Sequence, residues 1–582
     1  MNTPASPRFD PDEATPIPSK APSLSGLEKD SQRPSESSQS GAVGLPRSET
    51  LRSTATVVND KAQYTGSGTL EDPYVVDWAP EDPRNPFNWS PAKRWRITAI
   101  LAMTTLCIAF ASSSYSGGLQ FMMAELHMSQ YVGILGISLY VVGFGVGPLV
   151  WGPLSEMYGR RLIFIISFLP FTLFHLGGAL AHNIPTLLVT RFLAGAFGSS
   201  PLTNAGGTIA DMFTARDRGL ASALFAMAPF AGPVLGPIVG GYVSESRAGW
   251  RWNFWIMFIF SAVMFVLSVL LVPETFAPVL LRRRARELHA ESEGKLHYVS
   301  KYEKGSKKAF GEIMKINLSR PFVLLFQEPI VLLFSIYTAL IYGTLYGLFA
   351  AFPVVFQRGR HFSPGEGGLA FLGVGLGIVI ATSCTPISNK IYYRAMEKGN
   401  GIYYRAMEKG NGVAPPEARL VMACVGAVLL PISMTWFAWT TYPSVHYIVP
   451  IIAGVPFGAG MLFVFTSVIS YLIDTYTLYA ASALAANAVM RSIMATVFPL
   501  FTPRMYASLG DQWACMVFAF LALACTPIPF LFYRFGPAIR ARSKFSVSPP
   551  SSTPVPQAIE RELEREAEVE AEKRHAAARS AA

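Results

Sequence analysis

The chain of 582 residues is predicted to be an all-α integral membrane protein with twelve transmembrane helices arranged as two six-helix bundles. Three observations predict this fold. Half of the residues are apolar (51%), only 15% are charged, and the mean hydropathy is +0.33. Soluble proteins carry about 25% charged residues, so a set of ordinary soluble domains is excluded. The apolar content also excludes disorder along the whole chain.

Apolar segments long enough to cross the ~30 Å hydrocarbon core, which takes about 20 helical residues, recur from Trp95 onward. The first six are expected at 96–117, 131–153, 161–181, 186–209, 219–243 and 252–273. Six more are expected at 329–355, 367–388, 419–440, 446–472, 481–507 and 512–534. The predicted organisation is a disordered N-terminal tail (1–94), an N-terminal bundle (95–274), a basic central loop (275–328), a C-terminal bundle (329–535) and a disordered C-terminal tail (536–582).

The positive charge of the chain, formally +10 at pH 7, concentrates in alternate loops. Basic clusters precede the first span, follow the second and fourth, and fill the central loop (Lys93, Arg94, Arg160, Arg161, Arg216, Arg218, Arg282, Arg283 and Arg284). Lys and Arg mark cytosolic loops, so both termini are expected in the cytosol. The outer loops hold exceptions (Arg247, Arg251, Arg358, Arg360 and Arg504). Because the charge is spread over one membrane face, nucleic acid is not an expected partner.

Metal sites and bound cofactors are not expected. The five cysteines lie in apolar runs and lack the spacing of a zinc site (Cys107, Cys384, Cys424, Cys515 and Cys525). Eleven residues at 391–401 are repeated at once as 402–412. We interpret this repeat as a duplication in a cytosolic loop that tolerates insertion, with a regulatory contact as the alternative.

The loop after the second span carries a compact charged motif, Gly152-Pro-Leu-Ser-Glu-Met-Tyr-Gly-Arg-Arg161. The glycines at 152 and 159 permit a tight turn and close helix approach. Glu156, Arg160 and Arg161 are expected at the membrane surface, where an ion pair between them would latch one conformation. The alternative is a surface turn whose arginines only set the topology.

Two spans contain a basic residue well inside the apolar stretch. Arg191 lies in the fourth span, followed by Asn204, and Arg491 lies in the eleventh, one turn after Asn487. An unpaired cation at the centre of a helix costs about 2.5–3.5 kcal/mol on insertion scales. We therefore interpret these four residues as proton-coupling or substrate-path residues. The alternatives are an Arg191 held by a backbone carbonyl and an Arg491 paired with Asp474.

The fifth span is rich in glycine and proline. Gly232, Gly236 and Gly240 recur every four residues and line one face, the pattern of close helix packing in lipid. Pro233 and Pro237 each remove a backbone donor and kink the helix. Together with Gly241, this motif predicts a hinge, and static packing is the alternative.

Aromatic side chains in the spans are candidates for an amphipathic pocket. The predicted pocket residues are Tyr115, Tyr342, Tyr346 and Phe463, from a wider set that includes Tyr140, Trp255, Tyr337 and Phe465. The alternative for each is ordinary helix packing. Glu125 and Asp211 lie near span ends, and no carboxylate is expected well inside the first bundle. The proton carrier is therefore not assigned.

These motifs together resemble the major facilitator superfamily, in particular its twelve-span drug:proton antiporters. Gly232 to Gly241 matches the antiporter motif G-x3-GP-x2-GG at every fixed position. The 152–161 loop matches the family motif except that Glu156 replaces Asp. In the fourth-span motif Ala194 stands where Gln usually precedes the Gly, and the loop before the ninth span (386–390) has largely lost the equivalent of the 152–161 motif. Similarity to fungal multidrug and polyamine exporters lies in further short segments (78–89, 137–140, 251–255, 273–275 and 416–420).

The resemblance implies a transporter, not an enzyme, in which two bundles rock around a midplane site. It implies export of a small hydrophobic or amphiphilic molecule, such as a secondary metabolite, glycolipid or drug, driven by proton entry and without a cofactor. A polyamine exporter, or an importer of sugars or organic acids, is the alternative. A monomer in the lipid of the plasma membrane is expected, with the vacuolar membrane as the other location. A membrane enzyme would need a Ser/His or paired acidic motif inside the spans, whereas His175 is a lone intramembrane histidine.

Overall fold

The computed structural model describes residues 64–79, 81–214, 218–303, 310–385, 416–476, 479–543 and 545. Most of both tails and the tandem repeat at 391–412 lie outside the described residues, as does Arg216. The expectations stated above for those segments stay predictions.

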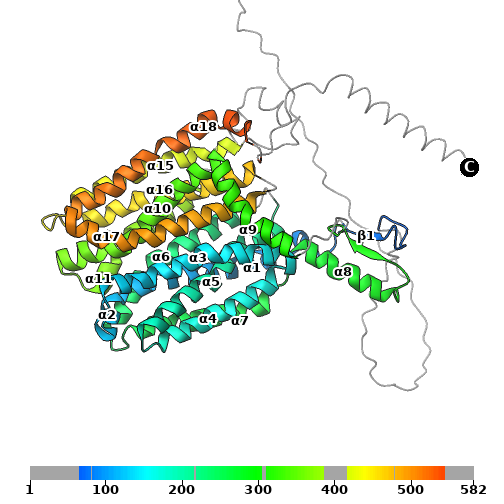
Figure 1. Ribbon diagram of the computed structural model, residues 1–582, viewed down its shortest axis with the longest axis horizontal. Coiled ribbons are helices and arrows are strands. Elements are labelled where there is room, and N and C mark those ends of the chain that lie inside the picture. The colour runs from blue at the N-terminus through cyan, green and yellow to red at the C-terminus, as the bar shows by residue number, and fades with distance from the viewer. Residues whose placement is uncertain are drawn as a thin grey trace, which may run out of the picture. The chain divides into compact units, whose positions relative to one another are not determined.

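The first bundle consists of six long helices that follow the predicted spans. They are α1 (Pro91–Gly117), α3 (Gln130–Tyr158), α4 (Arg160–Ala179), α5 (Ile184–Met212), α6 (Arg218–Glu245) and α7 (Arg251–Leu271) (Figure 1). Three of these helices begin after a residue whose side chain accepts a hydrogen bond from the first turn, namely Ser90, Ser129 and Asn183. A short helix that the sequence did not predict, α2 (Leu119–Leu126), joins α1 to α3.

The second bundle begins with α10 (Pro329–Phe352), which continues as a π-helical turn, η3 (Pro353–Arg358). The eighth predicted span is divided into α11 (Pro364–Leu369) and α12 (Leu372–Ser383), and η4 (Pro416–Leu420) leads into α15 (Val421–Thr440). The remaining helices are α16 (Ile448–Thr475), α17 (Ala480–Cys525) and α18 (Pro527–Arg540). Gly510, with φ 77°, breaks α17 where the eleventh span ends and the twelfth begins.

Ten helices in the described part of the chain are long and apolar enough to cross a membrane. One of these, Ala480–Arg540, is 61 residues long and contains both the eleventh and twelfth spans. α5 is not among the ten because Arg191, Asn204 and several Ser and Thr residues lower its hydropathy. With these two points taken into account, the twelve-helix prediction is confirmed.

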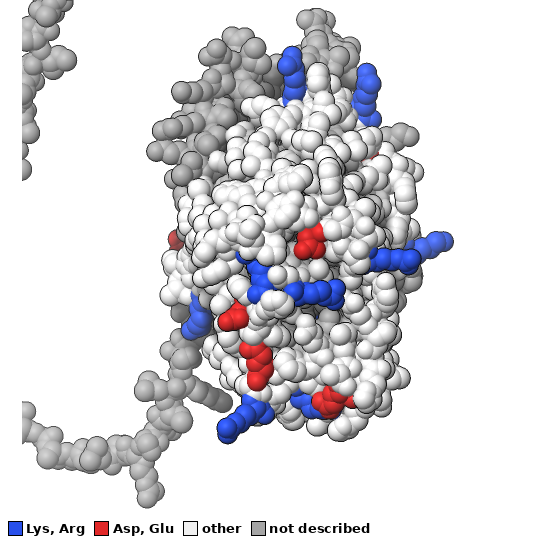
Figure 2. All heavy atoms as spheres, turned by 90° about the vertical axis from the view of Figure 1, so that its left-hand side faces the viewer, with Lys and Arg blue, Asp and Glu red and all other residues white. Residues whose placement is uncertain are grey.

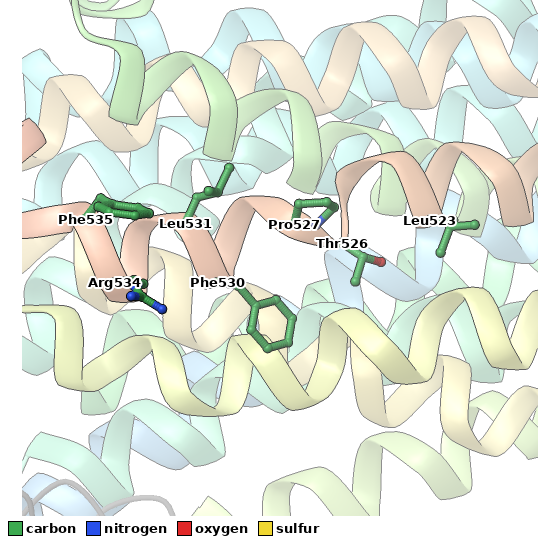
Figure 3. Close-up of a pocket in the computed structure, with 7 residues that line it drawn as sticks. All are labelled: Leu523, Thr526, Pro527, Phe530, Leu531, Arg534 and Phe535. Atoms are coloured by element: carbon green, nitrogen blue, oxygen red, sulfur yellow. The ribbon is translucent and has the colours of Figure 1, made fainter.

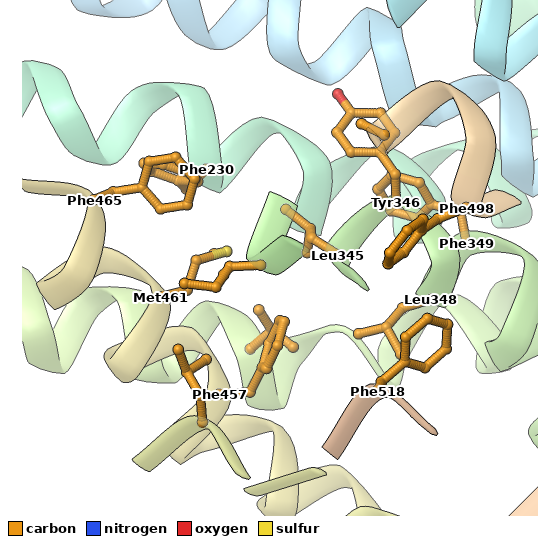
Figure 4. Packing of buried hydrophobic residues seen from close by; sticks show 14 of the residues in the cluster. Phe230, Leu345, Tyr346, Leu348, Phe349, Phe457, Met461, Phe465, Phe498 and Phe518 are labelled. Atoms are coloured by element: carbon orange, nitrogen blue, oxygen red, sulfur yellow. The ribbon is translucent and has the colours of Figure 1, made fainter. Parts of the chain in front are cut away.

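Within each bundle the closest helix pairs include both parallel and antiparallel neighbours, since contacts run in the same direction along α1 and α6 but in opposite directions along α15 and α16. α1 packs on α6 and α3 on α5 in the first bundle, and α10 packs on α17 and α15 on α16 in the second. The bundles meet where α3 contacts α17 and where α6 contacts α11. Figure 4 shows buried side chains of the second bundle, with the ring of Phe230 from α6 of the first bundle beside that of Phe465 from α16.

The polar segments around the bundles hold structure that the sequence did not predict. Strand β1 (Tyr74–Val76) pairs in parallel with β2 (Tyr298–Ser300) from the central loop. The loop also contains α8 (Ala277–Glu291) and α9 (Phe310–Gln327). The expected disorder of 1–94 is therefore wrong for the strand at 74–76. The strand is ordered by a tertiary contact, because Val76 packs into a buried cluster on α8 (Leu281, Ala285 and Leu288).

Candidate functional site

Arg191 of α5 is fully engaged with the backbone of two neighbouring helices. Its Nε donates to the carbonyl of Gly136 on α3 (3.1 Å), and its two terminal nitrogens donate to Ala111 (2.7 Å) and Ser112 (3.0 Å) on α1. The side chain is only 2% exposed. The guanidinium also lies over the rings of Tyr140 and Tyr115, at 4.3 and 4.8 Å.

This arrangement favours the structural alternative for Arg191. A buried cation is tolerated when all its donors are paired, and three carbonyls with two aromatic faces supply that pairing. Tyr115 belongs to this clamp, because its ring covers the guanidinium and packs edge-on against Phe254 of α7. The clamp joins α1, α3 and α5 inside the first bundle.

Arg491 of α17 has the opposite environment. Its guanidinium lies over the rings of Tyr342 and Phe465, at 5.4 Å from each. Within the described part of the chain its side chain makes no hydrogen bond or ion pair, and its Nε is buried without a partner. The alternative pairing with Asp474 is absent, since Asp474 accepts from Nε of Arg419 at 3.0 Å.

The two rings that flank Arg491 pack in turn on further aromatic residues, one of which, Phe230, comes from the first bundle. We call Arg491, Tyr342, Tyr346, Phe465 and Phe230 the Arg491 cluster. The hydroxyl of Tyr342 donates to that of Tyr346 (3.4 Å), which in turn is 2.9 Å from the hydroxyl of Ser112 on α1. The ring centroids of Phe230 and Phe465 are 5.0 Å apart, and the two rings can be seen beside each other in Figure 4. The cluster therefore brings α6 of the first bundle together with α10, α16 and α17 of the second.

Two other predicted residues of the second bundle, Asn487 and Phe463, lie outside this cluster. Asn487 donates to the Thr338 hydroxyl on α10 at 2.7 Å, one turn before Arg491. Phe463, a predicted pocket residue, lies against Gly426 of α15 and outside the cluster. The ring from this helix that contacts Arg491 is Phe465. Phe230 was not predicted, and no local pattern identifies it because it lies among the small residues of α6.

Asn204 lies near the end of α5, where it lines a small crevice with Arg160 and Arg161. Its amide nitrogen donates to the Ser200 hydroxyl at 3.1 Å. The structure therefore separates Asn204 from Arg191, although both belong to one helix. Asn204 belongs to the charged end of the bundle and not to the Arg191 clamp.

The charged motif at 152–161 is held by two carboxylates that the sequence analysis did not pair with it. Arg160 contacts Asp211 of α5 (3.5 Å) and donates to the Ser155 hydroxyl (2.8 Å). The Glu274 carboxylate accepts from the backbone nitrogens of Arg160 and Arg161, both at 3.0 Å, and so caps α4 from another segment.

Glu156 itself is exposed and makes no ion pair within the described residues. The proposed pairing of Glu156 with the two arginines is thus not the contact that the structure contains. Gly159 has φ 100°, a backbone conformation that favours glycine and that turns the chain between α3 and α4. Gly152 has room around it, since an added Cβ would meet only Thr203 at ordinary contact distance.

The second bundle has a comparable charged end built from Pro416-Glu-Ala-Arg-Leu420. Arg419, just before α15, pairs with Asp474 at the end of α16, much as Arg160, the first residue of α4, pairs with Asp211 at the end of α5. Glu417 accepts from Arg540 of α18 at 3.1 and 3.2 Å in a buried, two-point contact. Residues 386–390, where the sequence motif is largely lost, lie outside the described residues.

The glycine motif of α6 has two partners. Gly232, Gly236 and Gly240 face α1, where an added Cβ would collide with Ala109, Ser113 and Ser114 respectively. Gly241 faces α11 of the other bundle, against Pro364 and Gly365. Pro233 and Pro237 lie inside the helix. Pro237 also contributes to the junction with α11, because its carbonyl approaches Gly368.

Besides the Ser112–Tyr346 contact, three hydrogen bonds between the bundles in the described part of the chain lie toward the end that carries α2 and α11. Ser138 of α3 donates to the Thr496 carbonyl (2.8 Å), and Gln120 of α2 donates to Gln357 of η3 (2.7 Å). Glu245 at the end of α6 accepts from the backbone nitrogen of Gly365. Figure 2 shows this end, which carries α2 and α11, as a mostly uncharged face with scattered side chains of both signs.

A surface groove of about 430 Å³ lies where α17 passes into α18 (Figure 3). Its lining is almost entirely apolar (Leu523, Thr526, Pro527, Phe530, Leu531, Arg534 and Phe535). Leu523 and Phe535 are about half exposed, at 55% and 51%. Such exposure is typical of side chains that face lipid, and none of these residues belongs to the Arg491 cluster.

Comparison with known proteins agrees with this architecture. A family model described as Major Facilitator Superfamily matches residues 101–499. The MFS-type efflux pump MFS2 of Trichophyton rubrum is 51% identical over 484 residues, which cover 83% of this chain and 79% of that protein. The Aspergillus fumigatus multidrug transporter mdrA is 49% identical over 484 residues, which cover 83% and 77%. 

The solved structure of the xylose transporter XylE from E. coli, at 17% identity, matches with a TM-score of 0.53 and covers 76% of this chain and 99% of that one. At this identity the likeness shows the fold alone. Twelve spans in two bundles, the family model and the similar relatives agree, and the chain belongs to the major facilitator superfamily of membrane transporters.

Proposed function

We propose that the chain is a proton-coupled efflux pump that exports small hydrophobic or amphiphilic molecules by alternating access. The observation that carries this proposal is the Arg491 cluster. It combines a polar group with aromatic faces, as small-molecule sites do, and it receives side chains from both bundles. A molecule bound there would contact both halves that must move. Relatives named as an efflux pump and a multidrug transporter support export.

Alternating access requires contacts that break at one end while others form at the opposite end. The hydrogen bonds Ser138–Thr496 and Gly365–Glu245 join the bundles at the α2 end. Opening of this end would separate α3 from α17 and α6 from α11. Gly241 of α6 and Gly365 of α11 let the two bundles approach closely at this end without interlocking side chains, because small residues permit close helix packing.

Proton entry is proposed as the energy source, with no bound cofactor. We further propose that the transporter acts as a monomer in the plasma membrane with both termini in the cytosol, or alternatively in the vacuolar membrane. A polyamine exporter would need acidic side chains at its site. No carboxylate of the described residues pairs with Arg491, so the polyamine alternative is less well supported.

The test is deletion of the gene in its host, followed by measurement of secreted and retained metabolites and of toxin sensitivity. We expect at least one compound to shift from medium to cells and at least one toxin to become more potent. A proton uncoupler applied to the wild type should produce the same shift. If neither metabolites nor sensitivity change, the export proposal is wrong. If export persists with the uncoupler, the proton coupling is wrong.

A further inference from the structure

The two intramembrane arginines of the described chain differ in how their donors are used. Each guanidinium has five N–H donors and no acceptor. Those of Arg191 reach three backbone carbonyls, at 2.7, 3.0 and 3.1 Å. The side chain of Arg491 has no hydrogen-bond acceptor within the described residues, and its Nε is buried. Both residues are arginines, so the unequal pairing of their donors comes from the surroundings of each side chain.

Aromatic rings alone do not complete the environment of Arg491. Tyr342 and Phe465 present faces that attract a cation. Within the described residues they supply its N–H groups with no acceptor, and the buried Nε donor is left unpaired at a cost in free energy. The Tyr342 hydroxyl is turned to Tyr346, with which it shares a hydrogen bond, and not to Arg491. An acceptor from outside the chain is therefore expected at this position.

We propose that Arg491 binds the carboxylate of the cargo, and that the preferred cargo is an aromatic or otherwise apolar carboxylic acid. The planar guanidinium matches the two oxygens of a carboxylate in a two-point contact. The rings of Phe465 and Phe230 supply an apolar wall beside it. This inference rests on the proposed export function, and it narrows the expected hydrophobic or amphiphilic cargo to an anionic amphiphile.

The cluster also explains how such a cargo would be sensed by both bundles. Arg491, Tyr342 and Phe465 belong to the second bundle, whereas Phe230 belongs to the first. Tyr346 links the two through its contact with the Ser112 hydroxyl at 2.9 Å. A carboxylate on Arg491 with its ring against Phe230 would thus span the interface that alternating access rearranges.

The experiment compares three probes with one ring system: naphthalene-2-carboxylate, naphthalene-2-carboxamide and naphthalen-2-ylmethylammonium. Binding to the purified full-length transporter is measured by calorimetry at pH 7. We expect the carboxylate to bind about tenfold tighter than the amide or more, and the ammonium to bind most weakly. The variant Arg491→Gln should remove the preference for carboxylate over amide while the amide still binds. Arg491→Lys should keep part of the preference.

The matched control is Arg504→Gln, the same substitution at an exposed position of the same helix. It should leave all three affinities unchanged. The proposal is overturned if the wild type binds the carboxylate no better than the amide, or if Arg491→Gln retains the wild-type preference. If Arg491→Gln does not fold, the wild-type preference and Arg491→Lys still decide the question.

Transport of the same probes separates this inference from the proposed function. If the wild type exports the amide but shows no preference for the carboxylate in binding, export stands and the anion site fails. If the wild type binds the carboxylate through Arg491 but exports neither probe from cells, the anion site stands and the export proposal fails.

Discussion

At the scale of the residue, a buried charge takes its role from what surrounds it. Arg191 and Arg491 are both arginines inside apolar helices. Arg191 donates to carbonyls of α1 and α3 and so holds these two helices to α5. Among the described residues, Arg491 contacts aromatic rings and no hydrogen-bond acceptor, so its N–H donors are available to a ligand. Hydropathy and spacing cannot separate these two cases.

The first prediction concerns the Arg191 clamp. Arg191→Ala removes three hydrogen bonds from a charged donor and leaves the Gly136, Ala111 and Ser112 carbonyls without that partner. We expect a loss of about 3 kcal/mol or more in stability, measured as a lower unfolding temperature of the detergent-solubilised protein and a lower amount in the membrane. Arg191→Lys should lose less. Unchanged stability in Arg191→Ala, with transport abolished, would instead support a coupling role.

At the scale of the element, α6 shows how one helix serves two interfaces. Its glycines at 232, 236 and 240 pack on α1 of the same bundle, and Gly241 packs on α11 of the other. The antiporter motif therefore combines close packing within a bundle with a contact between bundles. The hinge role of Pro233 and Pro237 stays a prediction.

The second prediction separates these two faces of α6. Gly241→Ala would press on Pro364 and Gly365 of α11, and such overpacking costs about 1–3 kcal/mol. We expect the α2 end to open more often. The measurement is alkylation of a cysteine placed at Ser138, which is fully buried between the bundles. Its rate should rise about fivefold or more.

The control for this experiment is Gly236→Ala, which collides with Ser113 of α1 inside the first bundle. This variant should lower the unfolding temperature without raising the alkylation rate at position 138. Equal alkylation rates in both variants would contradict the division of α6 into two faces.

At the scale of the whole molecule, the two ends are held by different contacts. The α2 end joins the bundles through Ser138–Thr496 and Gly365–Glu245. The opposite end carries an ion-pair site in each bundle, Arg160–Asp211 in one and Arg419–Asp474 in the other. Each of these sites stays within its own bundle, so neither ion pair has to break when the bundles separate.

The third prediction is a pH dependence at the α2 end. Hydrogen bonds from Arg251 and from the Trp250 indole hold the pKa of Glu125 below its usual value. A lowered folded-state pKa stabilises the protein above the unfolded value of about 4.3, and this contribution is lost as the pH falls through the folded value.

The pair is partly exposed, so the contribution should be about 0.5 kcal/mol. We expect Glu125→Gln to unfold at a slightly lower temperature than the wild type at pH 6–7, with the gap closing below about pH 4. Thermal unfolding across this pH range checks it. A gap that widens at acid pH would contradict this sign.

The spans were predictable because their cause is local. About 20 apolar residues suffice to cross the hydrocarbon core, so hydropathy placed α1, α3 and α4 within a few residues of their bounds. The break at Gly510 was equally visible as a gap between the eleventh and twelfth spans. The strand pair β1–β2 was missed because Tyr74–Val76 gains its partner, Tyr298–Ser300, from a segment more than 220 residues away.

The sequence by itself determined the family, the twelve spans, the charged motif at 152–161 and the glycine face of α6. The tertiary structure alone decided that Glu274 and Asp211, and not Glu156, hold Arg160 and Arg161. It alone decided that Arg191 is bound to three carbonyls, whereas Arg491 has no hydrogen-bond partner in the described ranges. The physical reason is that hydropathy and helical period are properties of neighbours in the chain, whereas the pairing of a buried charge depends on which helices pack beside it.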